Sequence, residues 1–110
     1  MSHQAQFING QWLAGEGHNF SSVNPANNDV IWQANTATAA QVSAAVDAAR
    51  EAFIPWSDKS FEARLEVVQA FAEQLKANAE ELAVIIAKET GKPLWETRTE
   101  AGAMVGKVAI

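Results

Sequence analysis

Residues 30–53, VIWQANTATAAQVSAAVDAAREAF, contain the point at which the hydrophobic pattern of this chain changes. Residues 30–34 are rich in apolar, β-branched and aromatic side chains, which favours a strand. After them, apolar side chains recur at helical spacing: Val42, Val46, Ala49 and Phe53. Thr38, followed by Gln41, has the spacing of an N-terminal capping box. We therefore predict a boundary near residue 36, with strands before it and helices after it.

Short strands are expected in the first third of the chain: residues 6–8, 11–13, 20–23 and 30–34. The clearest signal is Asn9-Gly10, because both residue types tolerate the positive φ angles of a type I′ hairpin turn. Asn24-Pro25 ends the third strand, since the residue before proline is driven out of helical conformation. A sheet of this size would be marginal without other elements packed against it.

Four helices are expected after the boundary. We predict that Pro55 ends the first helix, which spans residues 39–54, and that Ser60 caps the second. Asn78 is expected to cap the third, and Gly91 to supply the left-handed residue that closes it. The fourth helix keeps its apolar spacing up to the last residue. This pattern predicts that the sequence is a piece of a longer polypeptide.

Composition excludes several classes of protein. The 110 residues include 13 acidic and 8 basic side chains, a net charge of −5, which argues against nucleic-acid binding. Cysteine is absent, so disulfides and thiolate metal sites are excluded. The apolar run at residues 82–87 is far too short to span a bilayer, and the N-terminus lacks the pattern of a secretory signal. We expect a cytoplasmic protein without nucleic-acid or membrane partners.

Candidate chemistry within the 110 residues is sparse. Among the carboxylates at i, i+4 spacing, two pairs are candidates for a site: Glu62 with Glu66, and Glu96 with Glu100. A metal centre would need further ligands, but the two histidines, His3 and His18, lie in the strand region. We interpret both pairs as solvated helix faces. Gly91-Lys92 lacks the other residues of a phosphate-binding loop. The tryptophans are expected in a core or an interface: Trp12, Trp32, Trp56 and Trp95.

Three motifs, in this order and spacing, resemble the start of the aldehyde dehydrogenase superfamily: FINGQW at 7–12, VNPA at 23–26, and ETGKP at 89–93 with Glu96. The resemblance covers residues 6–110 and implies an α/β fold. This segment would be a short β-hairpin and strand region followed by about four helices, within a larger doubly wound cofactor-binding domain. Residues 1–36 would then join the oligomerisation and cofactor region. Residues 37–110 would form the helical layer of an incomplete NAD-binding domain.

The resemblance implies an enzyme that oxidises an aldehyde to a carboxylate with NAD or NADP as cofactor. The family does this through a cysteine thiohemiacetal, hydride transfer to the nicotinamide, and glutamate-assisted hydrolysis of the thioester. The cysteine, the glutamate and the cofactor contacts are expected beyond Ile110. No catalytic or cofactor-binding residue is therefore expected among these 110, and the chain alone should be inactive. The resemblance also implies a homo-oligomer, a dimer or a tetramer.

Two finer expectations come from the same resemblance. Residues 91–100, with Met104 and Lys107, most resemble family members that oxidise N-succinylglutamate 5-semialdehyde in arginine catabolism. Some members also bind a monovalent cation, through backbone carbonyls at the strand matching Ser22-Val23 and an acidic side chain eight residues after the Gly-Lys-Pro proline. That position is Ala101 here, with Glu100 one residue earlier. The candidate ligands are therefore Ser22, Val23 and Glu100.

Two other classes of function remain open at this stage. One is a self-contained α+β module that binds a protein partner or serves assembly through its tryptophan-rich surface. The other is a small acidic protein that binds a metal ion through carboxylates.

Overall fold

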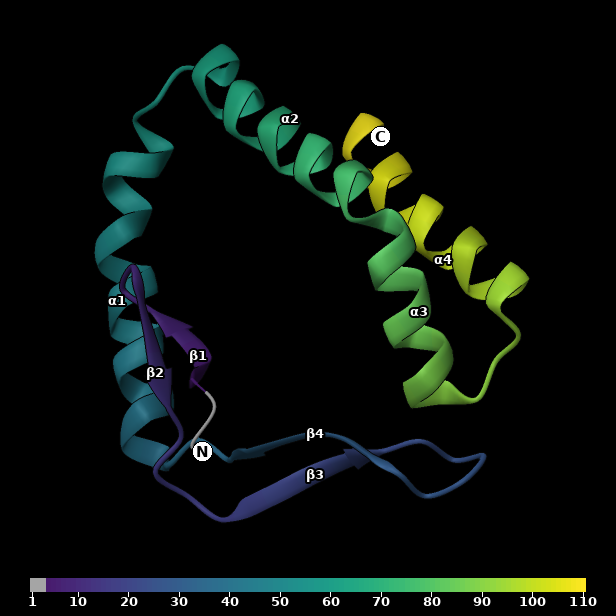
Figure 1. The fold of residues 1–110 in the computed structure, drawn as a ribbon. Helices are drawn as coiled ribbons and strands as arrows, with labels where there is room; N and C mark the ends of the chain where they lie inside the picture. Colours follow the sequence, from purple (N-terminus) through teal and green to yellow (C-terminus); the bar gives the residue numbers. More distant parts are fainter. Residues whose placement is uncertain (1–3) are drawn as a thin grey trace. The chain divides into compact units, whose positions relative to one another are not determined.

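The computed structural model describes residues 4–110 and shows short strands followed by four helices (Figure 1). The strands are β1 (Gln4–Ile8), β2 (Gln11–Ala14), β3 (Asn19–Val23) and β4 (Val30–Asn35). The helices are α1 (Ala39–Ser57), α2 (Phe61–Ala77), α3 (Ala79–Thr90) and α4 (Leu94–Gly106), followed by a 3₁₀ turn at Lys107–Ala109. The predicted order of elements is confirmed. His3 lies outside the described residues.

Strands β1 and β2 form the antiparallel hairpin that Asn9-Gly10 predicts. Phe7 pairs with Trp12 across the two strands. The turn residues have φ angles of 51° at Asn9 and 77° at Gly10, both in the region that a type I′ turn requires. The rings of Phe7 and Trp12 lie 5.2 Å apart between centroids, which adds a cross-strand aromatic contact.

Strands β3 and β4 form a second two-stranded sheet. Beside it, the Gly17 N–H donates to the Thr36 carbonyl at 2.8 Å, and the Thr36 N–H donates to the His18 carbonyl at 2.8 Å. A Cβ atom at Gly15 would overlap the backbone carbonyl oxygen of Asn35, so only glycine allows this close approach. The segment between β2 and β3 is thereby fixed against the end of β4.

Helix α1 begins as predicted but ends later. The Gln41 N–H donates to Thr38 Oγ1 at 3.3 Å, and the Thr38 N–H donates to Gln41 Oε1 at 3.2 Å, so the capping box is confirmed. The predicted end at residue 54 is wrong, because the helix continues through Pro55 to Ser57. Proline removes a single N–H here, and the Asp58 N–H still closes the last turn by donating to the Ile54 carbonyl at 3.0 Å.

The chain forms two compact units, which are described separately. The first contains the described residues up to Ser22 together with Val30–Lys59, and the second contains Val23–Asp29 and Ser60–Ile110. Helix α1 therefore belongs with the strands rather than with the other helices. The roles expected for residues 1–36 and 37–110 within a larger enzyme stay predictions.

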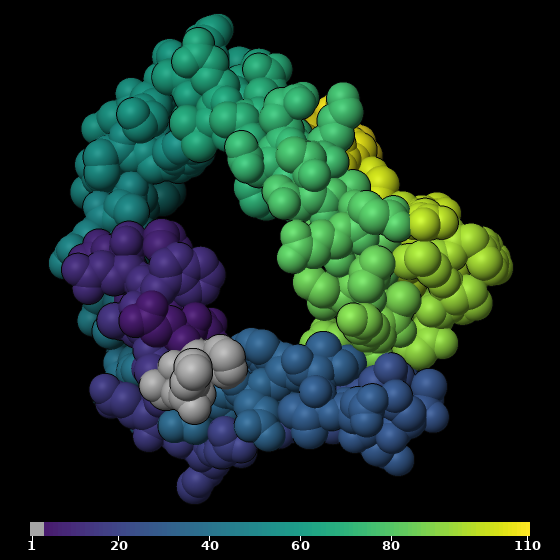
Figure 2. Space-filling model, viewed as in Figure 1, coloured from purple at the N-terminus to yellow at the C-terminus, as the bar shows by residue number. Residues whose placement is uncertain are grey.

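In the first unit, the β1–β2 hairpin lies along α1. Figure 2 shows the purple hairpin against the teal helix. A shallow groove of about 340 Å³ separates the two elements, and small alanine side chains form its helical wall. Ala34 of β4 is buried in this unit.

In the second unit, α4 packs against both α3 and α2. The buried side chains of this unit are Ala83 of α3 and Thr97 and Ala101 of α4. The Thr97 Oγ1 hydroxyl donates a hydrogen bond to the Leu94 carbonyl at 3.1 Å. Asn78 is the N-cap residue of α3, as predicted, but its side chain forms no capping hydrogen bond there. Its side chain Nδ2 instead donates to the Gln74 carbonyl at 2.8 Å and so closes α2. The reason is backbone conformation, because φ −107° and ψ 13° at Asn78 differ from the extended geometry usual for an N-cap.

Large apolar side chains of both units remain exposed in this chain. Among the described residues, the buried side chains are those of three alanines and Thr97. Phe53 of α1 and Phe61 of α2 are each 65% exposed, and Trp95 is 71% exposed. From the sequence, the tryptophans are expected in a core or an interface. None of the four is buried in a core here, so the expectation of an interface stays a prediction.

Candidate functional site

The turn between α3 and α4 carries the Gly-Lys-Pro motif. Gly91 has φ 75° and ψ 9°, the left-handed conformation predicted for it, and its N–H donates to the Ala87 carbonyl at 2.9 Å. Pro93 is extended, with φ −60° and ψ 142°, and α4 starts at the next residue. The turn is therefore defined by two residues with restricted or unusual backbone angles.

The loop between β3 and β4 meets this turn. The Asn24 N–H donates to the Asp29 carbonyl at 2.8 Å, and Asn24 Oδ1 accepts from the Ala26 N–H at 2.9 Å, which shapes the loop around Pro25. A Cβ atom at Gly91 would lie 2.9 Å from Pro25 Cγ. Two of the sequence motifs, VNPA and Gly-Lys-Pro, are thus adjacent in space, and both the φ angle and the space beside position 91 favour glycine there.

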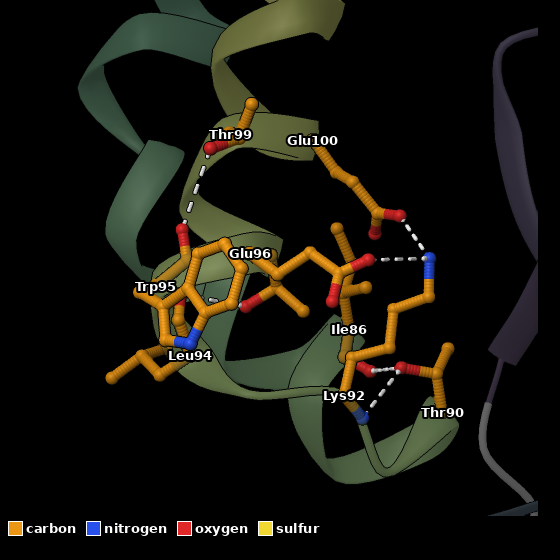
Figure 3. A network of polar contacts seen from close by, with 9 residues as sticks. Ile86, Thr90, Lys92, Leu94, Trp95, Glu96, Thr99 and Glu100 are labelled. Atoms are coloured by element: carbon orange, nitrogen blue, oxygen red, sulfur yellow. Dashed lines mark hydrogen bonds and ion pairs between the residues drawn. The ribbon is translucent and has the colours of Figure 1, made fainter.

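Lys92 forms the polar network at this turn (Figure 3). Its Nζ lies 3.6 Å from Glu96 Oε1 and forms a hydrogen-bonded ion pair with Glu100 Oε1. Its backbone N–H donates to Thr90 Oγ1 at 3.3 Å, and that hydroxyl donates to the Ile86 carbonyl at 2.7 Å. The hydrogen bond and the charge of Glu100 raise the pKa of Lys92 above its usual value.

The interpretation of Glu96 and Glu100 as a purely solvated pair is incomplete, because both carboxylates face the Lys92 ammonium. Sequence reasoning missed this partner, although Lys92 and Glu96 have the i, i+4 spacing that brings side chains together. Glu62 and Glu66 are both exposed on α2, as expected of a solvated face.

A second ion pair connects α4 to α3. Arg98 Nη2 donates to Glu80 Oε1 at 2.7 Å, and Arg98 Nε donates to Glu80 Oε2 at 2.9 Å. This two-pronged hydrogen bond lowers the pKa of the Glu80 carboxyl and raises that of Arg98. Both side chains are more than half exposed, so solvent screens the pair and its contribution to stability is small.

The candidate cation ligands are placed as follows. Ser22 lies in the first unit, whereas Val23 and Glu100 belong to the second. Ala101 is 1% exposed and carries no side-chain oxygen. Within residues 4–110, no three histidine or acidic side chains converge as a metal centre would require. Cation binding at these residues stays a prediction, and the Lys92 ammonium is the positive charge that Glu100 contacts.

The start of α4 is a poor fit for the pyrophosphate of a dinucleotide. A helix N-terminus binds phosphate through free N–H groups and positive charge. Here the carboxylate of Glu96 lies in the first turn, and the Lys92 ammonium is already paired with acidic side chains. This turn lies where the β3–β4 loop, the end of α3 and the start of α4 meet.

Across the described residues, none of the helices has both the length and the apolar character needed to cross a bilayer.

Comparison with known proteins gives one consistent result. A sequence model of the aldehyde dehydrogenase family matches residues 12–110. The fold is similar to that of an NAD-dependent benzaldehyde dehydrogenase from Corynebacterium glutamicum, with a TM-score of 0.91 and 26% identity over 98% of this chain and 24% of that one.

Two further solved structures agree. A betaine aldehyde dehydrogenase variant from Staphylococcus aureus, in complex with NAD⁺, has a TM-score of 0.87 and 30% identity over 96% of this chain and 22% of that one. A putative aldehyde dehydrogenase from Bacillus subtilis has a TM-score of 0.90 and 30% identity over 96% and 24% of the two chains. The 110 residues thus span about a quarter of the length of these structures.

Proposed function

Because this chain belongs to the aldehyde dehydrogenase family, we propose that it is the amino-terminal segment of an enzyme that oxidises an aldehyde to a carboxylate with NAD as the hydride acceptor. NAD supplies the hydride-accepting chemistry when bound. The catalytic cysteine and glutamate, and the contacts to the dinucleotide, are assigned to the part of the enzyme that follows these residues.

The observation that carries this proposal is the exposure of the apolar side chains. Phe53, Phe61 and Phe71 are each 59–65% exposed, whereas the buried side chains of the described residues are alanines and one threonine. Burying a phenylalanine contributes about 1.5–3 kcal/mol, so a folded protein is expected to cover such side chains. The matched structures are about four times longer, which gives enough further chain to cover them.

This segment's own contribution is structural. The Gly91 turn lies against Pro25 of the β3–β4 loop, and the Lys92 and Arg98 ion pairs connect α4 to the preceding turn and to α3. We assign residues 1–36 to the oligomerisation and cofactor region and residues 37–110 to the helical layer of the NAD-binding domain. The complete enzyme is proposed to be a cytoplasmic homodimer or homotetramer.

For the substrate we propose N-succinylglutamate 5-semialdehyde, on the basis of residues 91–100 with Met104 and Lys107. The relatives described above act on other aldehydes according to their names, benzaldehyde and betaine aldehyde, so they support aldehyde oxidation but not this choice. An anionic substrate would have to be attracted by basic side chains elsewhere, because this segment has a net charge of −5.

The test is a spectrophotometric assay of the polypeptide expressed from its natural reading frame. NADH formation is followed at equal concentrations of N-succinylglutamate 5-semialdehyde, benzaldehyde and betaine aldehyde, each with NAD and with NADP. We expect the largest kcat/KM for the succinylated substrate with NAD. A larger value for either other aldehyde would contradict the substrate assignment alone. No oxidation of any of the three would contradict the proposed enzyme.

The competing hypothesis of a self-contained binding module has less support. Such a module would need a core within residues 4–110, and the buried side chains there are small. A carboxylate–metal protein is likewise disfavoured, because Glu96 and Glu100 contact an ammonium group.

A further inference from the structure

Lys92 lies between two carboxylates that would otherwise be available to a cation. Its Nζ contacts Glu100 directly and Glu96 at 3.6 Å, and the two glutamates lie on consecutive turns of α4 (Figure 3). The lysine backbone is fixed as well, because its N–H donates to the Thr90 hydroxyl. The ammonium therefore contacts both carboxylates, and the Lys92 backbone has a hydrogen-bond partner of its own.

Position 101 offers no replacement ligand. Ala101 is 1% exposed, and its methyl side chain contributes to the contact between α4 and its neighbours. A sodium or potassium ion prefers carboxylate, carbonyl or water oxygens, as other hard cations do. Glu100 is the acidic side chain next to position 101, and its Oε1 atom already accepts a hydrogen bond from Lys92.

We propose that the Lys92 ammonium is the resident cation of Glu96 and Glu100, and that these two carboxylates bind no monovalent metal ion in this protein. One ammonium leaves one negative charge on the pair. Both carboxylates are about 40% exposed, so water solvates that remaining charge. The inference rests on the ion-pair geometry and does not depend on the proposed enzymatic activity.

The experiment uses the polypeptide expressed from its natural reading frame. It measures the thermal unfolding midpoint in potassium chloride, sodium chloride and choline chloride at equal ionic strength. Choline is too large for a site formed by two carboxylates, so the difference between the salts reports specific metal binding. Wild type is compared with Glu100→Gln, and with Glu96→Gln in case the first variant fails to fold. We expect the salt differences of wild type and variant to be the same.

The result that overturns the proposal is a potassium or sodium stabilisation of wild type that either glutamine variant abolishes. Stabilisation that persists equally in the variants supports the proposal, since the ion then binds elsewhere. Lys92→Met tests the second part of the proposal, that the Lys92 ammonium is the cation of the two carboxylates. We expect it to lower the midpoint and to remove most of the effect of Glu100→Gln in the double variant, because the two side chains would no longer be coupled.

Lys88→Met serves as the matched control, because Lys88 lies on the same turn region of α3 and forms none of the ion pairs found within residues 4–110. An effect of Glu100→Gln that is as large in the Lys92→Met background as in wild type would overturn the assignment of Lys92.

Discussion

At Gly91, both the backbone conformation and the packing against Pro25 favour glycine. Its φ of 75° costs other L-residues about 1 kcal/mol or more, and a Cβ would lie 2.9 Å from Pro25 Cγ. We expect Gly91→Ala to lower the free energy of unfolding by about 1–2 kcal/mol. Urea titration of the natural polypeptide, followed by circular dichroism, measures this change.

The matched control is Gly102→Ala in α4. Gly102 is helical, and a Cβ there meets no atom of residues 4–110 within 4 Å, so alanine raises the helix propensity at this position by about 0.5–1 kcal/mol. Pro25→Ala separates the two causes at Gly91. If the loss on Gly91→Ala is unchanged with alanine at position 25, the contact with Pro25 contributes nothing and only the φ angle matters.

At the scale of elements, Gln41 joins the start of α1 to the chain after β2. Its Oε1 accepts from the Thr38 and Glu16 N–H groups at 3.2 and 3.1 Å, and its Nε2 donates to the Ala14 carbonyl at 2.9 Å. We expect Gln41→Ala to cost about 1–2 kcal/mol, more than the loss of a single cap bond. Hydrogen exchange of the Glu16 and Thr38 amides should accelerate together.

Gln74→Ala provides the comparison for this prediction. Gln74 is exposed on α2, and its side chain forms none of the hydrogen bonds found within the described residues. It should leave the exchange of the two amides unchanged. Acceleration of the Thr38 amide alone in Gln41→Ala would show that the contacts to Ala14 and Glu16 contribute nothing.

The turns and helix ends of this chain show which features the sequence could predict and which it could not. The capping box and the Asn9-Gly10 turn were predictable because each depends on residues within four positions of one another. Pro55 and Asn78 misled the prediction, since α1 continues through Pro55 to Ser57 and the Asn78 side chain bonds backward to the Gln74 carbonyl. The approach of Pro25 to Gly91 depends on folding across 66 positions, so no local pattern reveals it.

At the scale of the whole molecule, the decisive property is how little of the apolar surface these 110 residues cover. Large apolar side chains on α1 and α2 are exposed, including Val46, Phe53, Phe61 and Phe71. Burial of apolar surface contributes about 25 cal/mol per Å² and must offset about 1–2 kcal/mol of backbone entropy per ordered residue. A core of three alanines and a threonine cannot supply this amount, although α1 and α2 have side-chain N-caps at Thr38 and Ser60.

We therefore expect the isolated 110-residue chain to unfold without a cooperative transition, to bind the dye ANS through its exposed apolar faces, and to oxidise no aldehyde. Calorimetry and ANS fluorescence measure the first two, with the natural polypeptide as the reference. Phe53→Ser should then reduce dye binding by the isolated chain, because it removes an exposed apolar ring, yet destabilise the natural polypeptide, in which we propose that the ring is covered. A sharp calorimetric transition of the isolated monomer, with no dye binding, would instead establish a self-contained module and would remove the main support for the proposed enzyme.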